Sequence, residues 1–274
     1  MYAGNLSLVI QGHLKQINRE YETTLERLTT NKKINRSSDD PSGSYIATQL
    51  NTRYRGYTQA SENTQTAINL LQTASDGLTS LQEQLTNLRA VALEAAAGGT
   101  PAQFTAWSAS ATTYKAAGDL ITNTTTFNGT KPLDGSANST FNIQAGPDGA
   151  ASNQINIGSA ISNNNTIAGL GLSGVTLADQ TNAAAAVTSI DAALATIANR
   201  IAALGTFDSV LTTHADFLST AAENMSAAEG TLVDADIAAE SARYSQLGAL
   251  QSSAATMLLK ANTNMTLLSF LYGS

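Results

Sequence analysis

Apolar residues recur at steps of three and four near both ends of the chain, within residues 5–50 and 233–274. This spacing places them on one face of a helix and predicts an amphipathic helix at each end. The first face carries Leu6, Ile10, Leu14, Ile17, Tyr21, Leu25 and Leu28, and the second carries Leu247, Leu250, Ala254, Met257, Ala261 and Leu268. We expect each stripe to need a partner surface, either the other stripe or a neighbouring copy of the chain.

Local signals mark where the first helix ends and the next begins. Asn31 tolerates the left-handed conformation of a helix stop, so we expect the helix to end there. Asp40 followed by Pro41 is typical of a helix cap with proline at the first helical position. Capping therefore explains the Asp39-Asp40 pair better than a role as paired catalytic carboxylates.

The clearest period lies between residues 71 and 95, where two sets of apolar positions repeat every seven residues. This pattern predicts a coiled-coil-like helix. Gly98 and Gly99 are expected to stop it, and Thr100 with Gln103 forms a predicted capping box for the next helix. The two sets are Leu71, Leu78, Leu85 and Ala92, and Ala74, Leu81, Leu88 and Ala95.

The chain changes character over residues 122–175, where Gly, Asn, Thr and Ser dominate. Alternating apolar and polar residues between turn signals predict short strands and hairpins. Residues 158–182 lack a helical period, and we expect them to form a loop or small excursion on the surface. Helix returns near residue 182, and a later stripe is predicted to follow Phe207, Val210, His214 and Phe217.

These elements predict a mainly α fold with a small β region. We expect an elongated antiparallel helical rod, coiled-coil-like, with β-hairpins and helical termini. Its predicted segments are residues 1–40, 41–182, 183–232 and 233–274.

Composition argues against several classes of function. The net charge of −7 disfavours nucleic-acid binding, which needs clustered Lys and Arg. Lys32, Lys33 and Arg36 are interpreted as a solvated turn. No apolar run approaches the roughly 20 residues of a membrane-spanning helix, so no membrane insertion is expected. No cleavable signal peptide is visible, so the protein either stays in the cytoplasm or leaves by another route.

Catalytic chemistry is not indicated. The chain has two histidines, His13 and His214, and no cysteine. Neither histidine has an evident nucleophile or orienting partner, so packing or rim positions are expected. Asp234 and Asp236 suit the first turn of the last helix. We therefore predict no enzyme, no cofactor and no metal site.

The segment "LERLTTNKKINRSSDDPSGSYIATQL" resembles bacterial flagellin. The matching residues are Arg27-Leu28, Lys33-Ile34-Asn35, Asp39-Asp40 and Gly43, with Asn31 where Gly is usual. Further similar segments follow in order: "LQEQLTNLRAVALEAAAGGT", "TTTFNGTKPLDGS", "FNIQAGPDGAASNQINI" and "VDADIAAESARYSQLGALQSSAATMLLKANTNMTLLSFL".

The resemblance implies an extracellular subunit that self-assembles into the flagellar filament for motility. It implies terminal helices in an inner core (1–40 and 233–274), longer helices in an outer core (41–182 and 183–232), and no large outer domains. Export through the flagellar type III machinery, an export chaperone, and cap and junction proteins as partners are further implications. The related hook–filament junction protein is an alternative, and a glycan-binding adhesin is a weaker one because aromatic residues are few in the β region.

A homopolymer of identical subunits is the predicted assembly. The candidate interface residues are Leu6, Ile10, Leu14, Ile17, Leu25, Leu28, Arg36, Asp39, Asp40, Leu247, Leu250, Met257, Leu268 and Leu271.

Overall fold

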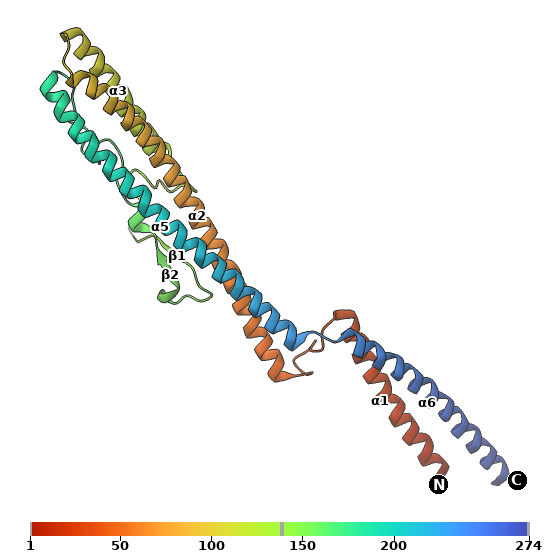
Figure 1. Ribbon diagram of the computed structural model, residues 1–274. Helices are drawn as coiled ribbons and strands as arrows, with labels where there is room; N and C mark the ends of the chain where they lie inside the picture. Colours follow the sequence, from red (N-terminus) through yellow and green to blue (C-terminus); the bar gives the residue numbers. More distant parts are fainter. Residues whose placement is uncertain (1, 138–139, 273–274) are drawn as a thin grey trace. The chain divides into compact units, whose positions relative to one another are not determined.

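The computed structural model describes the backbone of residues 2–137 and 140–272, and the side chains of residues 7–137, 140–264 and 266. Helices hold 75% of the chain, which confirms the mainly α prediction. Figure 1 shows the elements in sequence colours. They are α1 (Tyr2–Thr30), α2 (Pro41–Ala96), α3 (Pro101–Thr124), β1 (Asn142–Gln144), a 3-10 turn (Ala151–Asn153), β2 (Gln154–Asn156), α4 (Gly158–Ile161), α5 (Gln180–Val233) and α6 (Ile237–Tyr272).

Contacts divide the chain into two compact units. The terminal unit comprises residues 1–52 and 224–274, and the central unit comprises residues 53–223. The terminal unit includes the start of α2 and the end of α5, where the Asn51 amide donates to the Glu229 carboxylate at 3.0 Å. The sequence-based segments instead end at residue 40 and resume at residue 233.

The core of the central unit follows the predicted heptads. All eight seam positions between Leu71 and Ala95 are at most 1% exposed. They form one apolar cluster with buried positions of α5. Arg89 Nε donates to Asp191 Oδ1 at 2.5 Å, and Gln180 Nε2 donates to the Ala96 carbonyl at 3.0 Å. These contacts join the end of α2 to the start of α5, so the two helices run antiparallel, as Figure 1 shows.

The predicted stripe of α5 is wrong in its second half. Val210 is 51% exposed and Phe217 is 57% exposed, whereas their neighbours Leu211 and Leu218 are at most 1% exposed. The buried positions continue by sevens from Ile190, because the seam of α5 keeps the heptad step of its partner helix. The stripe predicted from Phe207 is therefore shifted by one residue from the buried positions.

The β region is small and antiparallel. Strands β1 and β2 pair with Ile143 opposite Ile155, which confirms the short strands expected here. Before them, Phe127 and Thr130 bridge across a tight turn. Asn128 and Gly129 fill its corner with φ of 46° and 79°, the left-handed conformations that Asn-Gly adopts most readily.

Residues 158–182 are not an excursion on the surface. Ile161, Ile167, Leu172 and Leu177 are at most 4% exposed and belong to the central core. Polar contacts also attach the segment to α3. The Ile167 N–H donates to Asp119 Oδ1 at 2.8 Å, and Lys115 Nζ donates to the Val175 carbonyl at 2.9 Å. The Gly, Ser and Asn residues make tight turns that carry apolar side chains inward.

Among the described helices, α5 is long and apolar enough to cross a membrane, judged by length and composition alone. Its best 18-residue window has a mean hydropathy of 1.2 and is 22% buried. The expectation of no such helix came from the lengths of uninterrupted apolar runs, whereas the many alanines of α5 raise its average. The same helix carries the buried heptad face of the central unit.

Candidate assembly surfaces

In the terminal unit, α1 and α6 run antiparallel and contact each other along their lengths. Pairs of polar side chains connect the two helices at intervals along this contact. Arg27 Nη1 and Glu240 Oε1 lie 3.1 Å apart, and Gln251 Nε2 donates to Asn18 Oδ1 at 2.9 Å. Leu247 is buried between the helices with 5% exposure. Each terminal helix therefore uses one face to bind the other.

The predicted interface residues fall into two groups. Ile10, Leu14, Ile17 and Leu28 are half-buried. Leu25, Leu250 and Met257 are 43%, 46% and 61% exposed. The side chains of Leu6, Leu268 and Leu271 lie outside the described residues.

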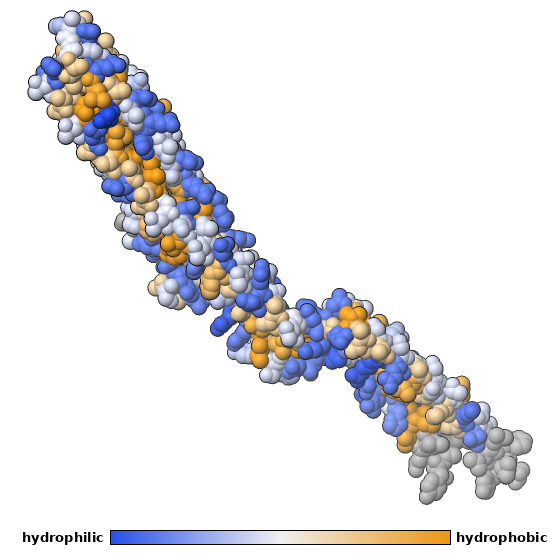
Figure 2. All heavy atoms as spheres, in the orientation of Figure 1, coloured by the Kyte–Doolittle hydropathy of each residue, from blue (hydrophilic) through white to orange (hydrophobic). Residues whose placement is uncertain are grey.

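The sequence analysis also missed exposed apolar residues of the terminal helices. Leu8, Val9 and Leu259 are 67%, 54% and 68% exposed. They lie beside the periodic positions, so a single stripe per helix could not include them. Figure 2 shows apolar patches among polar surface over the terminal helices. After α1 and α6 have paired, apolar side chains are still left in contact with water.

The turn between α1 and α2 is built by backbone hydrogen bonds to the chain that precedes α6. Asn31 ends α1 with φ of 58°, as predicted. The Lys33 N–H donates to the Val233 carbonyl at 2.8 Å, and the Ala235 N–H donates to the Asn31 carbonyl at 3.0 Å. The two connectors therefore form one paired structure within the terminal unit.

Asp39 and Asp40 have different roles. Asp40 Oδ1 accepts the Gly43 N–H at 2.9 Å and caps α2, which confirms the prediction. Asp39 does not cap the helix: its Oδ2 accepts the N–H groups of Arg36 and Asn35 at 2.9 and 3.0 Å. These hydrogen bonds, that from Arg36 first, hold the pKa of Asp39 below its ordinary value of 3.8.

Gly43 has a packing role beside this cap. It is buried, and a Cβ at this position would lie 2.8 Å from Ile34 Cδ1 and 2.9 Å from Asp40 Cγ. A side chain would therefore displace the capping carboxylate. Arg36 contributes less, because its 3.1 Å ion pair with Glu26 is exposed and such surface pairs contribute about 0–1 kcal/mol.

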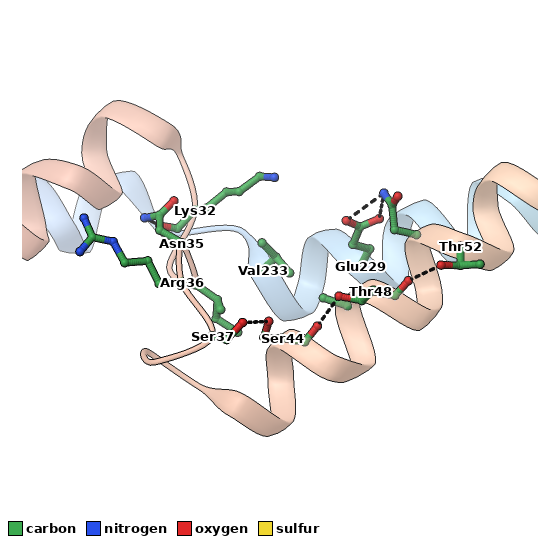
Figure 3. A pocket seen from close by; sticks show the side chains of 12 residues that line it. Lys32, Asn35, Arg36, Ser37, Ser44, Thr48, Thr52, Glu229 and Val233 are labelled. Carbon is green, nitrogen blue, oxygen red and sulfur yellow. Dashed lines mark hydrogen bonds between the residues drawn. The ribbon is translucent and has the colours of Figure 1, made fainter.

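Two open cavities flank this turn. The first, of about 300 Å³, lies between the turn, the start of α2 and the end of α5. In Figure 3 the Ser37 and Ser44 hydroxyls face each other, and their oxygens are 3.1 Å apart. Arg36 and Lys32 extend in opposite directions in this view. Among the residues that line it, no nucleophile is paired with a base, and the lining is mostly polar.

The second cavity, of about 370 Å³, is lined by charged groups that include Arg27, Lys33 and Glu240. Arg27 Nε and Glu240 Oε2 are buried there without a hydrogen-bond partner among the described residues. The ion pair between these two side chains uses their other atoms.

The histidines occupy the kinds of position expected. His13 is exposed, and His214 is half-buried with its Nε2 2.6 Å from the Ala145 carbonyl. Within the described part of the chain, no group of three or more His, Cys, Asp or Glu is placed to hold a metal ion.

Comparison with known proteins decides the family. The model of the bacterial flagellin N-terminal helical region matches residues 4–138, and that of the C-terminal helical region matches residues 187–271. The chain belongs to the bacterial flagellin family. The matched regions include nearly all of both terminal helices of this flagellin, all of α2 and α3, and nearly all of α5.

Two relatives of this flagellin match it over nearly its full length. It is 28% identical to the flagellin of Listeria innocua over 98% of both chains. It is 26% identical to the flagellar filament 30.7 kDa core protein of Treponema maltophilum, over 94% of this chain and 95% of that one. The crystal structure of Bacillus cereus flagellin matches with a TM-score of 0.50 and 26% identity, over 61% of this chain and 94% of that chain. The chain is a structural subunit of the extracellular flagellar filament.

Proposed function

We propose that this flagellin polymerises by burying, between neighbouring copies, the apolar faces that α1 and α6 leave exposed. The observation that carries the proposal is the exposure of Leu8, Val9, Leu250, Met257 and Leu259, each at least 46%. All five belong to helices that have already buried another face on each other.

The energies favour an assembly with several contacts per subunit. Full burial of a large apolar side chain contributes about 1.5–3 kcal/mol. About half of each of these five is still exposed, so burying them contributes roughly 4–8 kcal/mol. Association costs about 4–15 kcal/mol in lost freedom. Burial at one contact barely offsets this cost. In a helical polymer each subunit contacts several neighbours, so several burial energies offset the cost of fixing one subunit.

The proposed segments follow the family. Residues 1–40 and 233–274 form the inner core, and residues 41–182 and 183–232 form the outer core. Leu6, Leu268 and Leu271 extend the inner-core contact, and Arg36, Asp39 and Asp40 position the turn. Family membership also supports export through the flagellar type III machinery without a cleaved signal, with an export chaperone and cap and junction proteins as partners. Nothing favours the junction protein or an adhesin over the filament subunit.

A charge substitution tests the proposed interface. Met257→Asp should abolish filament formation, because a carboxylate in a dry helix contact costs several kcal/mol unless it is paired. Thr256→Asp is the matched control, because it adds the same charge at an adjacent exposed position outside the apolar patch. Sedimentation and electron microscopy measure assembly, and circular dichroism checks the fold. Normal filaments from Met257→Asp would remove this face of α6 from the interface.

A further inference from the structure

One pair of aromatic side chains in the terminal unit makes a close contact between α1 and α6. The Tyr21 and Tyr244 rings stack with centroids 4.4 Å apart and an angle of 27° between their planes. The Tyr21 hydroxyl donates a hydrogen bond to the Tyr244 hydroxyl. The two phenol oxygens and the ring carbons beside them are therefore close together.

The surrounding helices hold this pair in place. Arg27 with Glu240, at 3.1 Å, and Glu20 with Arg243, at 3.5 Å, join α1 to α6 near the tyrosines. A Cβ at Gly248 would lie 3.9 Å from Tyr21 Cε2, so the Tyr21 ring lies against α6 where the side chain is smallest. Both tyrosines are half-buried, which leaves one part of each ring open to solvent.

We propose that Tyr21 and Tyr244 form a site of oxidative dityrosine cross-linking that joins α1 to α6. The oxidant is hydrogen peroxide used by a haem peroxidase. Each phenol gives up one electron and one proton to become a phenoxyl radical. The radicals join through a carbon–carbon bond between the ring carbons ortho to the hydroxyls, and both rings then regain aromaticity. The two electrons and two protons reduce the peroxide to two molecules of water.

Two features favour this product over links between chains. Holding two reacting groups in contact converts a bimolecular step into a unimolecular one. The chain has no cysteine, so this tyrosine pair offers it a covalent link that disulfides cannot provide. The bond would close a loop between residues far apart in the sequence and would restrict the unfolded ensemble of the terminal unit, as other cross-links do.

The test uses the full-length protein, a haem peroxidase and hydrogen peroxide. We expect dityrosine fluorescence, a product of monomer size, and a proteolytic fragment pair containing Tyr21 and Tyr244 that has lost two hydrogen atoms. The yield should be about tenfold lower in the urea-unfolded chain, where the rings are not held together.

Two substitutions and a control make the site assignment specific. Tyr21→Phe and Tyr244→Phe should each abolish the monomer-sized product, with circular dichroism confirming an intact fold. Tyr45→Phe, which changes a tyrosine 65% exposed on α2, should leave it unchanged. The proposal is overturned if the linked fragments contain other tyrosines, if Tyr21→Phe retains the product, or if the folded and unfolded chains react equally.

Discussion

Asp39 and Asp40 are adjacent, carry the same charge, and stabilise different parts of the terminal unit. Asp40 caps α2, and sequence alone predicted this because proline follows it. Asp39 accepts two backbone N–H groups from the preceding turn. Its role depends on how the chain folds back over residues 35–39, which the pattern of residues did not encode. The local sequence therefore predicted the capping role of Asp40 correctly and the role of Asp39 wrongly.

Asp39 should make the stability of the terminal unit sensitive to acid. Its pKa is lowered in the folded chain by the N–H groups of Arg36 and Asn35. Such a group contributes stability above its ordinary, unfolded pKa of 3.8, and this stability is lost as pH falls through the lower folded value. Asp39→Asn should therefore lower the melting temperature at neutral pH, and the difference from wild type should shrink in acid.

Thermal unfolding followed by circular dichroism across this pH range measures the effect. Asp76→Asn, at an exposed position of α2, controls for the loss of one negative charge. A constant difference between Asp39→Asn and wild type at every pH would contradict the assigned role.

At the scale of elements, regular repeats were the features that sequence predicted best. The seam from Leu71 to Ala95 repeats every seven residues without interruption, and each position is buried. In α5 a second apolar series begins at Phe207, beside the true seam, and period alone could not choose between them. The choice depends on which face of α5 packs against α2, and the apolar cluster includes Ile197, Leu204 and Leu211 of α5 rather than Val210 or Phe217.

The register of α5 predicts different costs at neighbouring positions. Leu211→Ala removes a side chain that is 0% exposed and should destabilise the central unit by about 2–5 kcal/mol. Val210→Ala, at a position 51% exposed, should change stability by about 0.5 kcal/mol or less. Chemical denaturation compares the two variants. Equal losses would contradict the heptad register described for α5.

The segment of residues 158–182 escaped prediction for a related reason. Its apolar residues are spaced by tight turns, so they show neither helical nor strand period. Their burial depends on distant partners such as Asp119 and Lys115 on α3. Short irregular segments with such partners resemble exposed loops in sequence.

Insertions should separate the buried and exposed parts of this segment. A Gly-Ser pair placed between Ser173 and Gly174, both exposed, should leave the melting temperature nearly unchanged. The same pair between Asn165 and Thr166 should lower it clearly. Asn165 is 1% exposed, and its amide donates to the Leu133 carbonyl at 3.2 Å. Similar melting temperatures for the two insertions would show that the segment is loosely attached.

At the scale of the whole molecule, the two units differ in how much core they have. The large apolar cluster belongs to the central unit, from Ala67 to Leu211. In the terminal unit, α1 and α6 bury little apart from Leu247, Ala261, Thr24 and Ser7 among their described side chains. Segments with few buried apolar contacts open at lower free energy. The terminal unit is therefore the part that gains most from partners.

Limited proteolysis should reveal this difference. In the monomer, early cuts should fall within residues 1–52 and 224–274, while residues 53–223 resist. In the filament the same terminal sites should be protected, because the proposed assembly places neighbouring copies over them. Hydrogen exchange read by mass spectrometry locates the protected amides. Equal protection of the terminal unit in monomer and filament would indicate that it is already stable alone.

The polar side-chain pairs between α1 and α6 also have a consequence for the order of folding. These pairs join residues that lie 213 to 255 positions apart in the chain. Such distant pairings raise the contact order and form late, because a long loop must close before they contribute. During synthesis α1 is made before α6, so α1 lacks this partner until α6 has been translated. Closure of the terminal unit is therefore possible only after α6 has been made.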